Sequence, residues 1–355
     1  MSPSHKIRVL VVDDSAVARR SIMEALSHDP ELEVVGSACD AYDAREKILA
    51  LEPHVVTLDL EMPRMNGLTF LRILQEHHPI PVVVISSLTP QGSANALEAL
   101  ASGAVDVLAK PHGGQSLGEL APRLAYHVKA AARARRAPRD AEPAANTPGA
   151  GSETLLNVSN ISPRRILLIG SSTGGVEALR FLLPRLPAGL PPIVVVQHIP
   201  PIFSKNMADH LNALCPYEVR EAADGDELRS GLCLVAPGDY HLVLTNGSRG
   251  YRVRLTQSPP VHYCRPAVDV LFRSAAECAG RFAVAALLTG MGSDGARGLQ
   301  ALKATGARTL AESEESCVVF GMPQAAIKLG VVDQVAPLTQ MPQAILNALV
   351  QPVPA

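Results

Sequence analysis

The sequence contains no tryptophan, and aromatic residues make up only 3% of it, so its core cannot rest on aromatic side chains. Such a core must be built from Val, Leu, Ile and Ala, as is typical of α/β proteins with buried parallel sheets. The chain has 355 residues, which is too long for one ordinary core. Two domains are therefore expected.

Paired cysteine motifs are also missing. No C-x-x-C spacing occurs, and we expect most cysteines to be small core residues without disulfides. The six cysteines are Cys39, Cys215, Cys233, Cys264, Cys278 and Cys317. This usage favours a reducing compartment, most simply the cytoplasm.

Long apolar runs and a strong net charge are absent as well. No run approaches the ~18 residues of a membrane helix. Asp13 and Asp14 interrupt the first apolar stretch too early for a signal peptide. The net charge of −2 gives no reason to expect nucleic acid or an anionic membrane as partner. The protein is expected not to be inserted in a membrane.

The first third of the chain alternates strand-like and helical segments. The expected strands are Ile7–Val12, Leu32–Ser37, Val55–Leu58, Val82–Ile85 and Val105–Leu108. The expected helices lie near Ala16–Leu26, Ala41–Leu51, Gly67–His77, Ser93–Ala101 and Leu117–Ala132. Five βα units predict an open parallel sheet covered on both faces, with ligands at the carboxyl ends of its strands.

Polar residues occupy those strand ends. Asp13 and Asp14 follow the first strand, and Asp59 follows the third. Ser86 ends the fourth strand, and Lys110 follows the fifth. Clustered carboxylates invite a hard divalent cation, and a hydroxyl with an ammonium suits a phosphoryl group. Any one of these residues alone is better explained as a helix cap or turn residue, but all five together favour a site.

These strand ends resemble the receiver domain of two-component response regulators, over about residues 5–128. The motifs that carry the resemblance are Val11–Ser15, Leu58–Pro63 and Ala109–Pro111. The resemblance implies a flavodoxin-like fold that accepts phosphate from a histidine kinase, with a cis bond at Lys110-Pro111. It assigns Asp59 as the acceptor; Asp13, Asp14, Asp59 and the Glu61 carbonyl as Mg²⁺ ligands; and Ser86 and Lys110 as the groups that contact the phosphoryl.

A change in composition follows at Lys129. The expected division is a receiver domain at 1–128, a flexible linker rich in Pro, Ala and Gly at 129–163, and a catalytic domain at 164–355. The basic cluster at 129–139 would suit nucleic acid or an acidic partner. A solvated helix end is favoured, since no aromatic residues are interleaved for base stacking.

The second domain is centred on Ile166–Gly175, where a strand-like run enters a Ser/Gly turn before helical Val176–Leu183. Further strands are expected at Ile193–His198, with His198 at the end, and at Leu232–Ala236, His241–Leu244, Tyr251–Leu255, Phe282–Leu288 and Arg308–Leu310, with a hairpin turn at Asn246-Gly247. Further helices are expected at Pro266–Cys278, Ala296–Ala304 and Gly321–Leu329. The pattern predicts a second, Rossmann-like, doubly wound α/β domain.

Three reactive groups follow strand ends in this domain: Ser172, His198 and Asp294. A hydroxyl is a poor nucleophile unless an imidazole takes its proton and a carboxylate fixes the imidazole tautomer. Taken singly, Ser172 and Asp294 are better explained as helix caps. Glycines let backbone N–H groups of the Ser172 turn and the Met291 loop approach an oxyanion. The turn is not the G-x-S-x-G motif of α/β-hydrolases.

Five motifs resemble the catalytic domain of the CheB protein-glutamate methylesterases: Gly170–Gly175, Val196–Pro200, Arg265–Phe272, Thr289–Gly295 and Val319–Pro323. The resemblance implies a triad of Ser172 as nucleophile, His198 as general base and acid, and Asp294 as orienter. Met291 would supply an oxyanion N–H. The implied reaction is phosphorylation-activated demethylation of glutamyl methyl esters on cytoplasmic chemoreceptor helices, with glutamine deamidation, in chemotactic adaptation. No cofactor is expected for the hydrolysis.

Three alternatives stay open. The chain could serve a chemosensory pathway that does not control motility, or it could be a catalytically silent adaptor that docks on receptors. A DNA-binding regulator is disfavoured, because the second half offers glycine loops and strands instead of a basic recognition helix.

Overall fold

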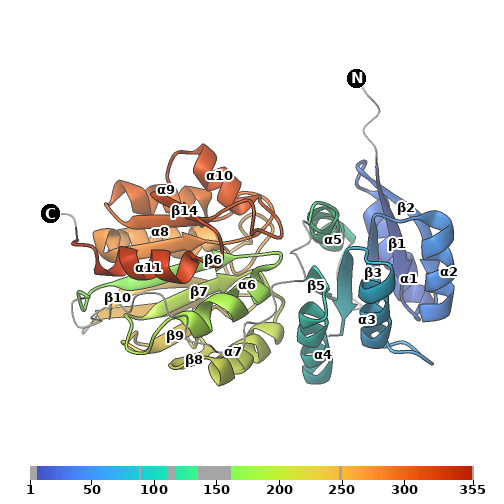
Figure 1. The fold of residues 1–355 in the computed structure, drawn as a ribbon, viewed down its shortest axis with the longest axis horizontal. Helices are drawn as coiled ribbons and strands as arrows, with labels where there is room; N and C mark the ends of the chain where they lie inside the picture. The colour runs from blue at the N-terminus through green and yellow to red at the C-terminus, as the bar shows by residue number, and fades with distance from the viewer. Residues whose placement is uncertain (1–5, 88, 111–116, 135–160, 248–249, 354–355) are drawn as a thin grey trace. The chain divides into compact units, whose positions relative to one another are not determined.

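The computed structural model describes residues 6–87, 89–110, 117–134, 161–247 and 250–353. It contains two α/β units, each with its own parallel sheet (Figure 1). Most of the predicted linker, residues 135–160, lies outside the described residues, as does Pro111 of the predicted cis bond. A cis bond that the sequence analysis did not predict is present at Arg265-Pro266.

The N-terminal sheet has the strand order β2-β1-β3-β4-β5, and all neighbours are parallel. Its strands are β1 (Ile7–Val12), β2 (Leu32–Ala38), β3 (Val55–Asp59), β4 (Val82–Ser86) and β5 (Asp106–Ala109). The five-stranded prediction is therefore confirmed. The strands expected at Val55–Leu58 and Val82–Ile85 each extend one residue further in the structure. Asp59 and Ser86 are therefore the last residues of β3 and β4, and both are held in sheet register.

Five helices alternate with these strands: α1 (Ala16–Ser27), α2 (Ala41–Leu51), α3 (Gly67–His77), α4 (Pro90–Ala101) and α5 (Leu117–Ala132). Ser15, Asp40 and Asn66 cap α1, α2 and α3 by accepting backbone N–H groups. The start of α4 was predicted three residues too late. Thr89 caps it, and proline suits a first helical position.

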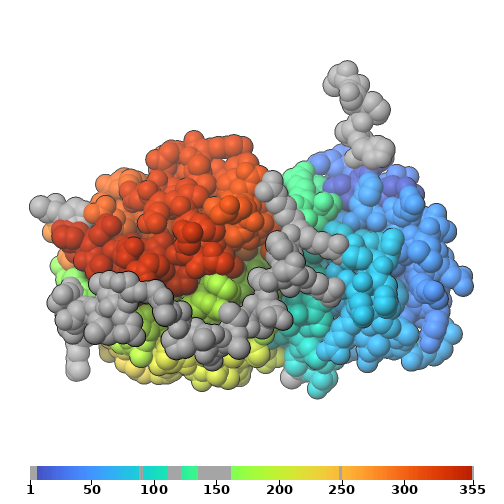
Figure 2. Space-filling model, viewed as in Figure 1, coloured from blue at the N-terminus to red at the C-terminus, as the bar shows by residue number. Residues whose placement is uncertain are grey.

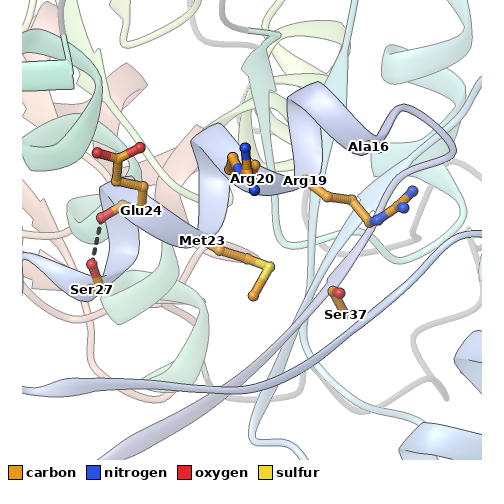
Figure 3. A pocket seen from close by; sticks show the side chains of 7 residues that line it. All are labelled: Ala16, Arg19, Arg20, Met23, Glu24, Ser27 and Ser37. Carbon is orange, nitrogen blue, oxygen red and sulfur yellow. Dashed lines mark hydrogen bonds between the residues drawn. The ribbon is translucent and has the colours of Figure 1, made fainter.

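One core of this unit lies between the sheet and helices α1 and α5. Alternate residues Val9 and Val11 of β1 pack with Ile22 and Leu26 of α1 and Leu124 of α5. Figure 3 shows a surface groove beside α1, where Arg19 and Met23 lie near Ser37 of β2. None of the predicted site residues lines this groove.

The C-terminal sheet has seven parallel strands in the order β14-β13-β12-β6-β7-β9-β8. They are β6 (Ile166–Ser171), β7 (Ile193–Gln197), β8 (Glu218–Glu221), β9 (Leu232–Val235), β12 (Ala283–Leu287), β13 (Arg308–Glu312) and β14 (Gln334–Ala336). The strand order reverses around β6, which pairs with both β7 and β12. Doubly wound sheets bind ligands at such a switch point, beyond the carboxyl ends of the strands.

Two strands and two helices of this unit escaped prediction. The edge strands β8 and β14 are short and partly exposed, so neither presents an apolar run. The unpredicted helices are α7 (Phe203–Leu214) and α11 (Met341–Val350). The buried side of α11 contacts β12, β13 and β14, and its outer side forms part of the red surface in Figure 2.

The predicted hairpin is present as a separate antiparallel pair, β10 (His241–Gly247) and β11 (Gly250–Thr256). Its predicted turn was misplaced. Asn246 and Gly247 pair with Tyr251 and Gly250 inside the ladder, and residues 248–249 between the two strands lie outside the described residues.

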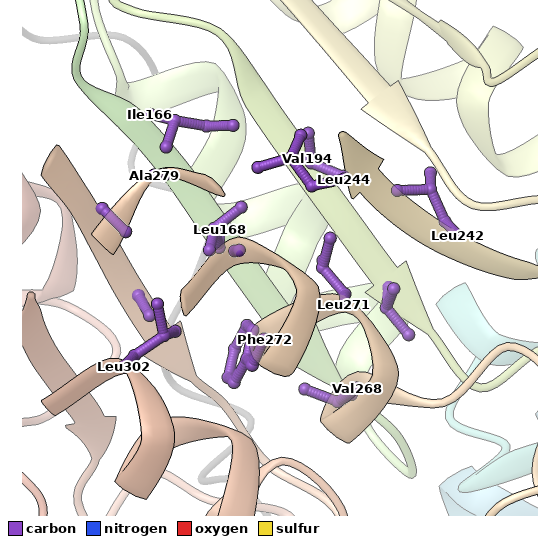
Figure 4. Packing of buried hydrophobic residues seen from close by; sticks show 14 of the residues in the cluster. Ile166, Leu168, Val194, Leu242, Leu244, Val268, Leu271, Phe272, Ala279 and Leu302 are labelled. Carbon is purple, nitrogen blue, oxygen red and sulfur yellow. The ribbon is translucent and has the colours of Figure 1, made fainter. Parts of the chain in front are cut away.

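The remaining helices are α6 (Gly175–Leu182), α8 (Val268–Cys278), α9 (Ala296–Ala304) and α10 (Met322–Lys328), with short 3₁₀ turns η2 (Leu183–Arg185) and η3 (Gly280–Phe282). Helix α8 buries Val268, Leu271 and Phe272 against Ile166 and Leu168 of β6 (Figure 4). Each fully buried Leu or Phe side chain contributes roughly 2 kcal/mol of transfer free energy. The start of α8 is thus anchored beside the end of β6.

All six cysteines are free. The expectation that most are core residues is wrong, since only Cys233 and Cys317 are buried. Within the described part of the chain, no helix combines the length and the apolar character required to cross a bilayer.

Candidate active site

Ser172 follows the last residue of β6 and is held by its backbone. Its N–H donates to the Thr289 carbonyl at 2.9 Å, and its carbonyl accepts the Gly175 N–H at 2.7 Å. Helix α6 is capped by Gly174, with φ +79°, and no side chain bonds to its first turn. The helix-cap explanation of Ser172 is therefore wrong, and its hydroxyl serves another partner.

That partner is His198, which follows the neighbouring strand β7. Ser172 Oγ lies 3.0 Å from His198 Nδ1, and Asp294 Oδ2 lies 2.7 Å from His198 Nε2. The three residues come from the ends of β6 and β7 and the loop after β12, which are adjacent in the sheet. All three are buried, with His198 8% exposed. The expected convergence of hydroxyl, imidazole and carboxylate is present.

Asp294 caps a helix, but the helix that it caps is α8 and not α9, which follows it in the sequence. Its oxygens accept the N–H groups of Val268 at 2.7 Å and Asp269 at 2.8 Å, which open α8. The positive end of α8 thus faces the carboxylate. Burial disfavours the ionised form, but the bonds from His198, Asp269 and Val268 outweigh it and lower the pKa of Asp294. The carboxylate stays charged and fixes the proton of His198 on Nε2.

Gln197 is a site residue that sequence reasoning missed. Its side-chain amide donates to the carbonyls of Ser172 at 2.9 Å and His198 at 3.0 Å. Its Oε1 accepts the Ser171 hydroxyl at 2.6 Å. The two neighbouring serines are thereby distinguished, because Ser171 bonds Gln197 and Ser172 bonds the imidazole.

The glycine loop after β12 lies directly against the serine. A Cβ on Gly290 would meet Ser172 Cβ at 2.7 Å and Met322 Sδ at 2.3 Å, so only glycine fits there. This contact places the loop that carries Met291 against Ser172. Of the expected oxyanion donors, the Ser172 N–H is engaged by Thr289, and the role of Met291 stays a prediction.

A turn at 261–264 brings a second unpredicted residue, Cys264, to His198. Its Sγ lies 3.4 Å from Nδ1. The central residues of the turn, His262 and Tyr263, have φ of +52° and +61°. Left-handed backbone costs non-glycine residues roughly 1–2 kcal/mol each. Such strain persists only where surrounding contacts hold it, as at functional sites.

The predicted acidic cluster of the N-terminal unit is also assembled. Carboxylate oxygens of Asp13, Asp14 and Asp59 lie within 4.8 Å of one another. Lys110 Nζ lies 2.7 Å from Asp59 Oδ2 and 3.2 Å from Asp13 Oδ2. The Glu61 N–H donates to Asp59 Oδ1 at 3.0 Å. These contacts bring five of the expected residues to one edge of the sheet.

The expected phosphoryl sensor, Ser86, faces a different group in this structure. Its hydroxyl is fully buried and donates to the Gly92 carbonyl of α4 at 3.0 Å. The hydroxyl must leave Gly92 if it is to contact a phosphoryl group on Asp59.

Comparison with known proteins decides the family. Residues 167–345 match the CheB methylesterase family model, and residues 9–121 match the response regulator receiver domain. The protein-glutamate methylesterase/protein-glutamine glutaminase 2 of Syntrophus aciditrophicus is 47% identical, over 96% of this chain and 99% of its own length. Its counterpart in Pectobacterium atrosepticum is 46% identical over 96% of each chain. This chain belongs to the CheB methylesterase family.

A solved structure supports the same assignment. The Thermotoga maritima CheB methylesterase catalytic domain is 42% identical and aligns with a TM-score of 0.51, covering 52% of this chain and 97% of that domain. The chain therefore combines a receiver unit with a methylesterase unit, as its strand-end motifs predict.

The acidic cluster of the receiver unit fits Mg²⁺. Asp13 Oδ2 is buried without a hydrogen bond, and the Lys110 ammonium lies 3.2 Å away as an ion-pair partner, so this oxygen already faces positive charge. Its neighbours are further carboxylates, and hard oxygen ligands are what Mg²⁺ prefers. Burial raises the pKa of Asp59 to about 6, although bonds from Lys110 and Glu61 oppose the rise. Additional positive charge at this cluster would favour the ionised acceptor.

The pH dependence of hydrolysis should report on His198. Burial disfavours its imidazolium, but Cys264 and Asp294 outweigh this effect and raise the pKa of His198 well above 6.5. A base must be neutral, so kcat/KM should fall as pH drops below that raised pKa. We expect the acidic limb of the kcat/KM profile to lie above pH 6.5. A limb centred lower, with the fold intact by circular dichroism, would contradict this expectation.

Glu312 of β13 is a buried carboxyl that supports the loop. Its oxygens accept the Thr289 N–H and the Ser316 hydroxyl, each at 2.9 Å. Burial raises its pKa above 4.5. The folded state then binds the proton more tightly than the unfolded state, so stability falls as pH rises above 4.5.

Glu312→Gln should remove the loss of stability above pH 4.5, because glutamine mimics the protonated carboxyl. Urea unfolding of both proteins at pH 4.5 and about pH 8 measures the change. The free energy of unfolding should fall less toward high pH in the variant than in the native chain. An identical pH dependence would show that Glu312 does not titrate in this window.

Proposed function

We propose that this chain is a phosphorylation-activated esterase that hydrolyses glutamyl methyl esters on cytoplasmic chemoreceptor helices, releasing glutamate and methanol. The observation that carries the proposal is the buried chain from Ser172 Oγ through His198 to Asp294, with separations of 3.0 and 2.7 Å. Glutamine side chains would be deamidated at the same site, since attack on an amide carbonyl uses the same groups.

The geometry supports the following sequence. His198 Nδ1 takes the Ser172 proton as Oγ attacks the ester carbonyl, and Asp294 stabilises the imidazolium that forms. The Met291 N–H stabilises the negative oxygen of the tetrahedral intermediate. The intermediate collapses as Nδ1–H protonates the departing methanol. Water, deprotonated by the same nitrogen, then releases glutamate from Ser172.

Regulation is assigned to the receiver unit. The Asp59 carboxylate accepts a phosphoryl group from a histidine kinase, and the Lys110 ammonium pairs with the phosphoryl oxygens. Asp13, Asp14, Asp59 and the Glu61 carbonyl would hold Mg²⁺, which supplies charge neutralisation when bound. Ser86 leaves the Gly92 carbonyl and contacts the phosphoryl group. The proposal places the protein in the cytoplasm, with no nucleic acid partner.

Methanol release from methylated receptor membranes tests the proposal. The full chain is assayed with and without a small phosphodonor and Mg²⁺. We expect release in both samples and faster release with the phosphodonor. Absence of release from several receptor sets in both samples would favour the silent adaptor. Release from receptors of only one chemosensory system would identify the pathway.

A further inference from the structure

The thiol of Cys264 contacts the same ring nitrogen of His198 as the Ser172 hydroxyl. Its Sγ lies 3.4 Å from Nδ1, against 3.0 Å for Ser172 Oγ. With its proton on Nε2 beside Asp294, a neutral imidazole has one lone pair at Nδ1. That lone pair accepts one good hydrogen bond at a time, so either Ser172 or Cys264 is left without a hydrogen bond to Nδ1. The site therefore holds two nucleophiles on a single buried base.

The turn that carries Cys264 is braced. Val261 and Cys264 exchange two backbone hydrogen bonds, of 3.1 and 2.9 Å. His262 Nε2 lies 3.1 Å from Asp269 Oδ2, which is in α8. Cys264 is partly exposed, whereas His198 is almost fully buried. The sulfur is thus fixed beside the imidazole, on a residue that is partly exposed to solvent.

The other thiols have different surroundings. Burial raises the pKa of Cys215, Cys233 and Cys278, which lowers their fraction of reactive thiolate. Cys39 is exposed, and its Sγ donates to the Asp40 carboxylate at 3.7 Å. Cys264 is the cysteine with a histidine base as its neighbour.

We propose that Cys264 is a thiol-modification site, paired with His198, at which a low-molecular-weight disulfide reversibly switches off the hydrolase. The inhibitory part of this inference rests on the proposed function. A group attached to Sγ lies beside Nδ1, where the ester carbonyl must approach Ser172, and it blocks both substrate and the serine–histidine bond.

The chemistry is thiol–disulfide exchange. His198 Nδ1 takes the Cys264 proton, and the thiolate attacks one sulfur of the small disulfide. A protein–small-molecule S–S bond forms as the original S–S bond breaks. The departing thiolate takes the proton from Nδ1–H and leaves as a thiol. Cys264 is oxidised and the small disulfide is reduced by the same two electrons, and a dithiol reductant reverses the step.

Treatment of the full chain with oxidised glutathione tests the proposal. The native chain, Cys264→Ser and the exposed-thiol control Cys39→Ser are each compared with their own untreated sample. Peptide mass mapping locates the glutathione, and methanol release measures activity. We expect the native chain and Cys39→Ser to lose activity on the order of tenfold, in proportion to modification of Cys264, and dithiothreitol to restore it. Treated Cys264→Ser should keep its own untreated rate.

A second measurement does not depend on esterase activity. The rate of Cys264 labelling is followed in Ser172→Ala, which leaves Nδ1 to the thiol, and in His198→Gln, which removes the base. We expect labelling at least as fast as native in the first and slower by on the order of tenfold in the second.

These measurements separate the two proposals. Equal labelling in the histidine variant, or full activity with Cys264 modified, would overturn the modification site, as would a treated native chain with no label on Cys264. Rapid histidine-dependent labelling in a native chain that releases no methanol would instead overturn the proposed function and the inhibitory role, leaving the thiol–imidazole pair.

Discussion

Ser172→Ala is expected to reduce methanol release on the order of 10⁴- to 10⁶-fold, because it removes the only atom proposed to attack the ester. The substitution keeps the Cβ that contacts Gly290. It also keeps the backbone bonds to Thr289 and Gly175. The fold should therefore persist, and thermal unfolding of the variant should match that of the native chain closely.

Ser171→Ala is the matched control. The neighbouring hydroxyl donates to Gln197 Oε1 instead of the imidazole. Its removal should cost about 1 kcal/mol of stability and leave the serine–histidine pair in place. Methanol release should stay within about tenfold of native, since only the support of the site is weakened. Comparable losses in both variants, or substantial release by the Ser172 variant, would reject Ser172 as the nucleophile.

Strand ends were the part of the fold that the sequence predicted best. Buried parallel strands appear as continuous apolar runs, so the residues that end them can be located within one or two positions. Ser172, His198, Asp59 and Ser86 were located in this way. The meeting of the Ser172 and His198 side chains follows from strand order, which apolar patterns do not encode. The strand order became known only from the structure, in which β6 lies between β7 and β12.

The missed site residues reach the site by other routes. Gln197 stands in the sequence directly before His198, and that position was its only signal. Cys264 is brought in by a turn whose central residues, His262 and Tyr263, are not the usual left-handed types. Asp294 was correctly expected near His198, but its bonds to the start of α8 join segments 25 and 26 residues apart. Local propensity carries no information on such long-range bonds.

Asp59→Asn is expected to abolish phosphoryl labelling of the chain by a small phosphodonor. An amide lacks the nucleophilic carboxylate oxygen, and Lys110 then has no phosphoryl group to pair with. The fold should survive, because burial already raises the pKa of Asp59 to about 6 and makes the ionised form costly near neutral pH. Label is measured on the intact chain in the presence of Mg²⁺.

Asp40→Asn provides a matched control at the same sheet edge. Asp40 is buried just beyond β2 and caps α2 by accepting the N–H groups of Tyr42 and Asp43. Asparagine caps a helix nearly as well, so labelling should be retained. Label persisting on the Asp59 variant at the native level would move the acceptor to another residue.

Activity measurements on the same variants connect the two units. If phosphorylation of Asp59 activates the esterase, Asp59→Asn should show the unstimulated rate of methanol release whether or not the phosphodonor is present. Asp40→Asn should be stimulated as the native chain is. Stimulation of an unlabelled Asp59 variant would mean that the phosphodonor acts elsewhere, because a population shift requires a ligand that binds one state of the protein better than the other.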